Sequence, residues 1–217
     1  MNNQDYKNSA LAALKGNWAP AVVCTIVFIA IAYVYVGLMV VPAYFTTNTN
    51  LLLILTAAAY VLAFFLYYPL TIGYMNSLKK LDVEGDNDLT RNMFKSGFKK
   101  YFRMVWGGLL FAIKVFLWSL LLIIPGIIKE FSYAMTPYIL EDDPDLSVLQ
   151  AIKKSKAMMK GHKFDLFYLW LSFIGWILLS VLTLGIGLIW LSPYIAAATA
   201  EFYQDVRSQY EASAVSE

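Results

Sequence analysis

Hydrophobic residues occur along this chain in long, uninterrupted blocks. Three blocks contain no Asp, Glu, Lys, Arg or His: 18–45, 51–78 and 166–200. About 20 apolar residues suffice to cross the hydrocarbon core of a bilayer as a helix, and each block is longer than that. A soluble helix of this length would carry a polar stripe facing water, which these blocks lack. The pattern predicts an all-α, polytopic transmembrane helical bundle.

Short breaks divide the apolar sequence into helices. Residues 46–50 are polar and uncharged, and Pro125-Gly126 interrupts a later apolar run. One helix over 166–200 would be about 52 Å long, too long for an ordinary span, and Gly185 and Gly187 permit a turn in its middle. The six expected helices are therefore about 18–44, 51–76, 103–124, 127–141, 164–183 and 187–206.

These helices form three expected hairpins, about 18–76, 103–141 and 164–206, within a single integral membrane domain covering 1–217. The second helix of each hairpin carries a proline with similar neighbours. The three related stretches are 68–71, 136–139 and 192–195. The fourth helix is short, which leaves open that it is re-entrant or interfacial instead of a full span.

Amphipathic segments are expected beside the hairpins at about 5–15, 89–102 and 147–160. In the second segment Phe94 and Phe98 fall opposite Lys95 and Lys99. In the third, apolar residues oppose lysines, Ser147 and Gln150 match a capping box, and Gly161 suits a helix stop. Both predict cytoplasmic interfacial helices, with the apolar side among acyl chains and the lysines towards headgroups. The alternative is ordinary basic sequence flanking the spans.

Lysines on the polar faces of these segments are the candidates for contact with anionic lipid headgroups. They are Lys95, Lys99, Lys100, Lys153, Lys154, Lys156 and Lys160.

Composition and charge support the membrane assignment and add an orientation. Hydrophobic residues make up 59% of the chain and charged residues 15%, against about 25% charged in soluble domains. Of the 17 Lys and Arg residues, 15 lie in the two terminal segments or in the loops 79–103 and 153–163. The positive-inside rule therefore places both termini and both loops in the cytoplasm.

Candidate chemistry is sparse. Cys24 and His162 are the single cysteine and the single histidine, so no intrachain disulfide can form, and a structural zinc site is excluded unless carboxylates dominate its ligands. HExxH, GxSxG and P-loop motifs are absent, and 185–187 is a lone GxG without a preceding strand. The acidic run 141–145 lacks the pattern of an EF-hand and is interpreted as a solvated turn. We expect no enzyme activity, cofactor, metal site or nucleic-acid partner.

Four ionisable residues fall in or beside the expected spans: Lys114, Lys129, Glu130 and Glu201. A charge at the centre of a membrane helix costs roughly 2.5–3.5 kcal/mol on insertion scales. Each of these residues is therefore expected to have a structural or functional role that offsets this cost. One interpretation makes them a polar pocket or ion path within the bundle. In the other, Lys129, Glu130 and Glu201 lie at the two interfaces, and only Lys114 lies deep.

Several stretches carry a family resemblance. They are 13–18 (Ala-Leu-Lys-Gly-Asn-Trp), 124–129 (Ile-Pro-Gly-Ile-Ile-Lys), 135–146, 151–163, 171–176, 182–187 and 202–206. Together they closely resemble the bacterial integral membrane proteins of domain of unknown function 975. The resemblance implies a multi-pass protein of the bacterial cytoplasmic membrane with no established activity, and it supplies no catalytic residues.

The sequence thus favours a non-enzymatic, uncharacterised multi-pass membrane protein that engages membrane lipid, with anionic headgroups expected, or a partner membrane protein or second copy of itself. The alternative is a small oligomeric transporter or channel that uses the four ionisable residues along one path. The two hypotheses differ in whether these residues share one cavity.

Overall fold

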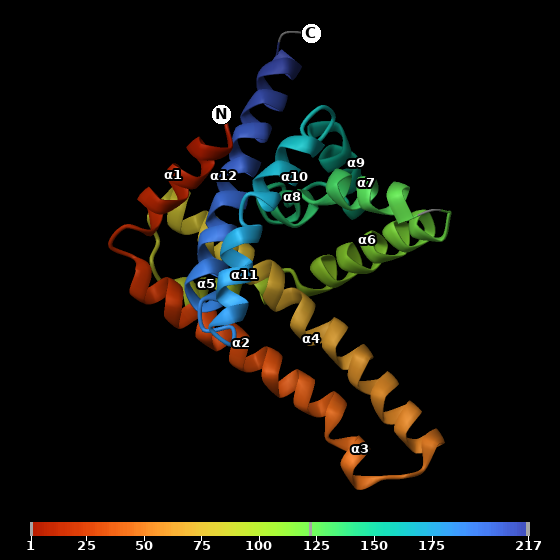
Figure 1. The fold of residues 1–217 in the computed structure, drawn as a ribbon. Helices are drawn as coiled ribbons and strands as arrows, with labels where there is room; N and C mark the ends of the chain where they lie inside the picture. Colours follow the sequence, from red (N-terminus) through yellow and green to blue (C-terminus); the bar gives the residue numbers. More distant parts are fainter. Residues whose placement is uncertain (1, 122, 216–217) are drawn as a thin grey trace.

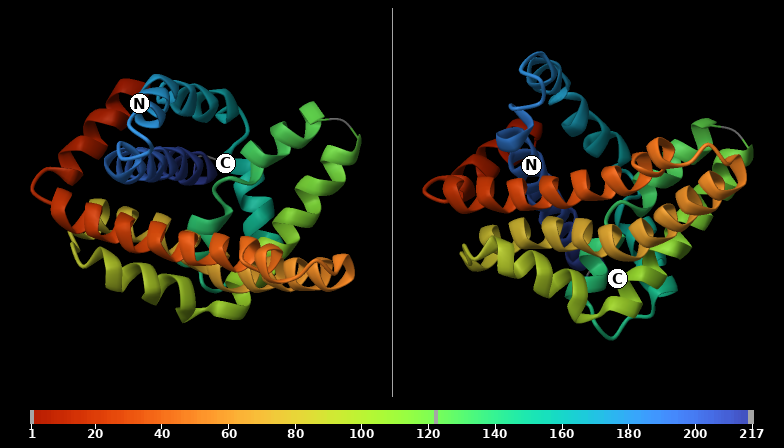
Figure 2. Two further views of the ribbon diagram at one scale, coloured as in Figure 1. Left: turned by 60° about the horizontal axis from the view of Figure 1, so that its bottom comes forward. Right: turned by 90° about the horizontal axis from the view of Figure 1, so that it is seen from below.

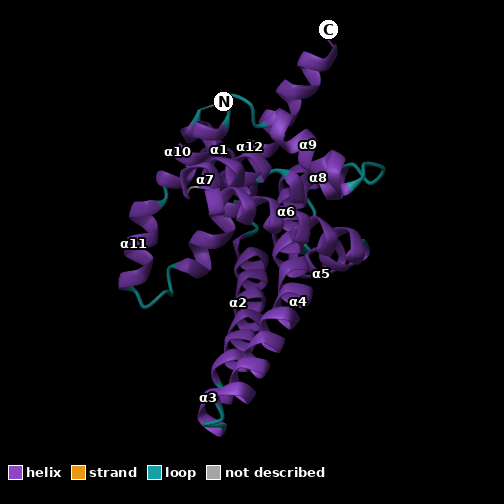
Figure 3. Ribbon diagram, turned by 90° about the vertical axis from the view of Figure 1, so that its right-hand side faces the viewer, coloured by secondary structure: helices purple, strands orange, loops and turns teal. Residues whose placement is uncertain are grey.

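The computed structural model describes residues 2–121 and 123–215, which form twelve helices and no strand. Figure 1 shows their order, and Figure 3 shows the loops between them. The first six are α1 (Asn3–Leu14), α2 (Trp18–Val40), α3 (Pro42–Phe45), α4 (Thr49–Glu84), α5 (Leu89–Lys99) and α6 (Tyr101–Leu121). The others are α7 (Ile123–Tyr133), α8 (Thr136–Asp142), α9 (Val148–Met158), α10 (Lys163–Leu171), α11 (Ile174–Leu182) and α12 (Leu188–Val215).

Helices α2 and α4 are the two long helices expected at the N-terminal end. The Asn48 side chain accepts a hydrogen bond from the Leu51 backbone N–H at 3.1 Å, which starts α4 after the expected polar break. The two helices lie side by side and project away from the rest of the molecule (Figures 1 and 2). Helix α4 continues through Pro69 to Glu84, beyond its expected end.

The later helices are more broken than the sequence predicts. The expected helix 127–141 is two helices, α7 and α8, because the chain turns at Ala134 and Met135 and Pro137 opens a new helix. The expected helix 164–183 likewise divides into α10 and α11. The turn predicted around Gly185 is present, with Gly185 at φ +86°.

Four helical stretches are long and apolar enough to cross a membrane: Trp18–Phe45, Thr49–Glu84, Tyr101–Ser119 and Lys163–Leu182. These stretches identify a membrane protein. In their most apolar windows only 11%, 6%, 22% and 22% of residues are buried, so most of this apolar surface is not covered by other helices. The α2–α4 pair and α6 extend from a shared base in different directions (Figure 1), and the expected six spans in three hairpins stay predictions.

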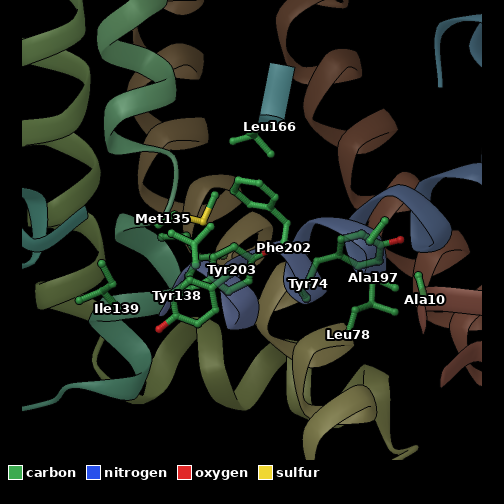
Figure 4. Packing of buried hydrophobic residues seen from close by; sticks show 14 of the residues in the cluster. Ala10, Tyr74, Leu78, Met135, Tyr138, Ile139, Leu166, Ala197, Phe202 and Tyr203 are labelled. Atoms are coloured by element: carbon green, nitrogen blue, oxygen red, sulfur yellow. The ribbon is translucent and has the colours of Figure 1, made fainter. Parts of the chain in front are cut away.

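The buried core lies at that base, away from the α3 tip of the α2–α4 pair. Helices α1, α5, α8 and α9 meet there with the C-terminal half of α4 and the middle of α12. Tyr138 of α8 stacks on Tyr203 of α12 with ring centroids 4.8 Å apart, and both side chains are buried (Figure 4). Tyr6 of α1 contacts Phe202 edge-on at 5.4 Å, so the two ends of the chain share this core.

Candidate functional site

The acidic run 141–145, which covers the end of α8 and the turn after it, is the centre of a network of ion pairs. Asp142 Oδ2 accepts hydrogen bonds from Tyr203 OH at 2.8 Å and from Arg207 Nη1 at 2.5 Å. Asp142 Oδ1 pairs with Lys79 of α4. The interpretation of this run as a solvated turn is wrong for Asp142, whose side chain is only 21% exposed. Its carboxylate ties α4 and α12 to the end of α8.

Neighbouring carboxylates extend the network. Asp143 Oδ2 lies 2.7 Å from Lys154 Nζ, and the Asp143 carbonyl accepts a hydrogen bond from Arg103 Nη2 at 2.7 Å. Glu141 Oε1 lies 3.3 Å from Lys80 Nζ. Lys154 was expected to face lipid headgroups, but its ammonium group is held by protein. The reason is that α9 folds back beside the turn that precedes it.

Helix α9 buries most of its apolar face inside the protein, although Leu149 is exposed. The capping box predicted for Ser147 and Gln150 is present, at 3.3 Å and 2.7 Å. Val148 and Ile152 are buried against the core, so the expectation that this face contacts acyl chains is corrected. The remaining candidates on the helix and just after it, Lys153, Lys156 and Lys160, are all exposed.

Helix α5 packs backbone to backbone on α4. A Cβ atom on Gly73 would lie 2.0 Å from the Met93 carbonyl oxygen, and one on Gly97 would lie 2.6 Å from the Pro69 carbonyl oxygen. Glycine at both positions allows this close approach. Leu89 and Met93 are buried, so part of the expected apolar face of α5 meets protein.

The other two faces of α5 remain exposed and run in parallel. Phe94 and Phe98 form an aromatic stripe that Phe102 extends into α6. Lys95 and Lys99, together with Arg91 one turn earlier, form the adjacent basic stripe, and all three side chains are exposed. We call these two rows the α5 stripes. Lys100, the last candidate of this segment, is half-buried at the junction with α6.

Three of the four ionisable residues lie on α6 and α7. Lys114 Nζ lies 5.9 Å from the centre of the Tyr133 ring, and Lys129 Nζ lies 4.2 Å from the centre of the Trp118 ring. Each lysine thus contacts an aromatic ring on the facing helix, where the ring's π-system attracts the cation. Glu130 is exposed.

Glu201 lies elsewhere, in the core beside the C-terminal end of α4. Burial, and then the hydrogen bond and charge of Asp82, raise the pKa of Glu201 to about 8. Gln204 donates a hydrogen bond to the same Asp82 carboxylate. The ionisable residues therefore form separate contacts with aromatic rings and with α4, and the structure does not bring Glu201 together with Lys114 or Lys129.

A groove of about 500 Å³ lies between α7 and the start of α10. It is lined by Ile127, Ile128, Phe131, Lys160, Gly161, Lys163, Phe164 and Phe167. We call it the α7–α10 groove. Of this set, only Lys160 was predicted from the sequence as a ligand contact. The sequence pattern that could have indicated this groove is the pair Lys160 and Lys163 next to Phe164 and Phe167, at one end of an apolar block.

A second cleft, of about 650 Å³, lies between α1 and the turn from α11 to α12. Its walls include Trp18, Trp176 and Trp190, with Lys7 on α1. The Lys7 ammonium already donates a hydrogen bond to the Ser172 carbonyl at 3.2 Å. The cleft is aromatic, and its one lysine is engaged within the protein.

Residues 109–210 match the model of a family described as "Protein of unknown function (DUF975)". The match covers 102 of the 217 residues, just under half of the chain. The DUF975 segment begins within α6 and ends within α12, so it contains the acidic turn with Arg207 and the whole α7–α10 groove. Helices α1 to α5 lie outside the match. Neither the curated proteins nor the solved structures contain a match to the chain.

Proposed function

We propose that this chain is a non-enzymatic, multi-pass membrane protein that binds anionic lipid at the surface where its packed core meets its spans. The α5 stripes carry the proposal. Their aromatic row is suited to the interfacial region of a bilayer, and the adjacent basic row is suited to phosphate headgroups. Close packing of α5 on α4 holds both rows in fixed positions at the base of a candidate span.

The proposed membrane topology follows from the helices that meet in the core. Parts of α1, α4, α8, α9 and α12 all belong to one core, so the chain comes back to the same side after each excursion. We propose three hairpins and six passages, with four made by the long apolar stretches. The two remaining passages are shorter, and are made by helix α7, which is about 16 Å long, and by the start of α12.

The core side is proposed to be cytoplasmic, because 15 of the 17 basic residues lie in segments on that side. The membrane is proposed to be the cell membrane of a bacterium, as the family resemblance implies. Cysteine labelling tests this orientation. In a Cys24→Ser background, a cysteine at Thr47 should react with an impermeant probe in intact cells, and one at Ser208 should react only after permeabilisation. The reverse result would overturn the orientation.

Lipid binding is tested by native mass spectrometry of protein released from nanodiscs of phosphatidylglycerol and phosphatidylcholine. The wild-type protein should retain phosphatidylglycerol in excess of its share of the bilayer. A Lys95→Gln, Lys99→Gln variant should reduce that excess by roughly fivefold for each lysine removed, because each contributes about 1 kcal/mol near an anionic surface. Lys15→Gln is the matched control, because it neutralises an exposed lysine that directly follows α1.

Equal retention of the two lipids by the wild-type protein would overturn the proposal. A stoichiometric protein partner in the same spectrum, with no retained lipid, would replace it by a role in assembly. The transporter alternative has less support, because Lys114, Lys129 and Glu201 contact different parts of the protein and line no shared cavity among those described above.

A further inference from the structure

The α7–α10 groove has an apolar floor and a basic rim. Phe131 of α7 meets Phe167 of α10 edge-on with ring centroids 6.0 Å apart, and its ring also lies 5.6 Å from Trp170. Ile127 and Ile128 form one apolar wall and are each 46% exposed. The volume of about 500 Å³ lies within the range typical of small-molecule sites.

The turn between α9 and α10 places two lysines on the rim. Gly161, at φ +97°, adopts the left-handed conformation that ends α9 and reverses the chain. Lys160 and Lys163, on either side of this turn, therefore line the same groove. Lys163 is also the first residue of the candidate span Lys163–Leu182, so the rim lies at the boundary between polar and apolar sequence.

Further positive charge lies close to the rim. Lys129 on α7 directly follows Ile128, which lines the groove. No carboxylate lines the groove, and among the described residues no salt bridge neutralises Lys129, Lys160 or Lys163. The nearest acidic residue in sequence, Asp165, pairs with His162 and lines a different cleft.

We infer that the α7–α10 groove is a discrete site for one anionic phospholipid. The ammonium groups of Lys160 and Lys163 bind the phosphate oxygens, and an acyl chain lies along Phe131, Phe164 and Phe167. Cations without a carboxylate partner attract an anion, and the apolar floor that leads away from them suits a hydrocarbon chain on the same molecule. This inference rests on the proposed lipid binding and assigns to it a single site on the DUF975 segment.

The site is tested by counting phosphatidylglycerol molecules that stay bound in native mass spectra at increasing collision energy. The wild-type protein should retain one molecule after the others have dissociated. Lys160→Gln, Lys163→Gln should weaken retention of that molecule about 30-fold, from roughly fivefold for each lysine. Ile128→Trp, which fills the groove and keeps every lysine, should abolish it. Circular dichroism and gel filtration confirm that both variants fold.

The α5 variant Lys95→Gln, Lys99→Gln separates this inference from the proposed function. It should lower the general excess of phosphatidylglycerol and leave the last, tightly held molecule in place. If Ile128→Trp and the rim variant both retain that molecule like the wild type, the groove is not the site, although the proposed function stands. Displacement of the lipid by millimolar inorganic phosphate alone would show that the groove binds a free anion, and would also overturn the inference.

Discussion

Arg207 Nη1 of α12 lies 2.5 Å from Asp142 Oδ2 at the end of α8, across 65 positions of sequence. The Asp142 side chain is 21% exposed and that of Arg207 27%, so the pair is neither fully buried nor freely solvated. Asp142 also holds Lys79 and Tyr203, which makes it the residue that joins α4, α8 and α12.

Replacing Asp142 should therefore destabilise the folded protein. Asp142→Asn removes the negative charge that Lys79 and Arg207 share and should lower the free energy of unfolding by about 2–3 kcal/mol, as hydrogen bonds to charged groups do. Thermal unfolding in detergent, followed by circular dichroism, measures the change. Asp145→Asn, an exposed residue of the same acidic run, is the control and should change stability by less than about 0.5 kcal/mol.

Glu201 should make stability depend on pH. Its pKa rises from an ordinary value of 4.5 to about 8 on folding, so between these values the folded state binds a proton that the unfolded state releases. The contribution of Glu201 to the free energy of unfolding therefore decreases as pH rises from 4.5 to about 8.

The measurement is Tm in detergent for the wild type and Glu201→Gln from pH 5 to pH 9. The difference should be small at pH 5 and grow in favour of the variant towards pH 9. Asp82→Asn, which removes the carboxylate that helps raise the pKa, should flatten the same dependence. A pH-independent difference between wild type and Glu201→Gln would contradict the prediction.

Close packing of α5 on α4 predicts a large effect of one methyl group. Gly73→Ala places a Cβ atom against the Met93 carbonyl, and overpacking of this kind typically costs about 1–3 kcal/mol. Gly37→Ala, in α2, is the control because no atom lies within 4 Å of its Cβ position. That variant should keep or slightly raise Tm, since Ala favours helix over Gly. Similar Tm values for the two variants would show that α5 is not held at this contact.

Adjacent lysines on α9 should behave differently. Lys154→Gln leaves Asp143 without its 2.7 Å partner and should lower stability by about 1 kcal/mol, at the upper end for a partly exposed pair. Lys153→Gln, at an exposed position, should leave Tm unchanged. Unfolding of the two single variants in detergent tests the assignment, which fails if they lose equal stability.

The sequence by itself determined the elements that local physics controls. Apolar blocks and their breaks gave α2, α6 and the start of α4 close to their observed limits, because helix length and turn residues depend on neighbouring positions. The break expected at Pro125-Gly126 is wrong, since both residues lie within α7. The capping box at Ser147 and the turn at Gly185 were predicted for the same reason. The motifs of the second half also carried the family resemblance that the match over 109–210 confirms.

Only the tertiary structure decided what each face of a helix contacts. The apolar face of α9 is compatible with lipid or with protein in the sequence, and packing against the core selects protein. The sequence of the run 141–145 is compatible with a solvated turn, but in the folded chain Arg207 and Lys79, from distant segments, form ion pairs with Asp142. Likewise, the α7–α10 groove requires α7 beside α10. Such contacts depend on how separate helices pack, and periodicity within one helix does not specify its partner.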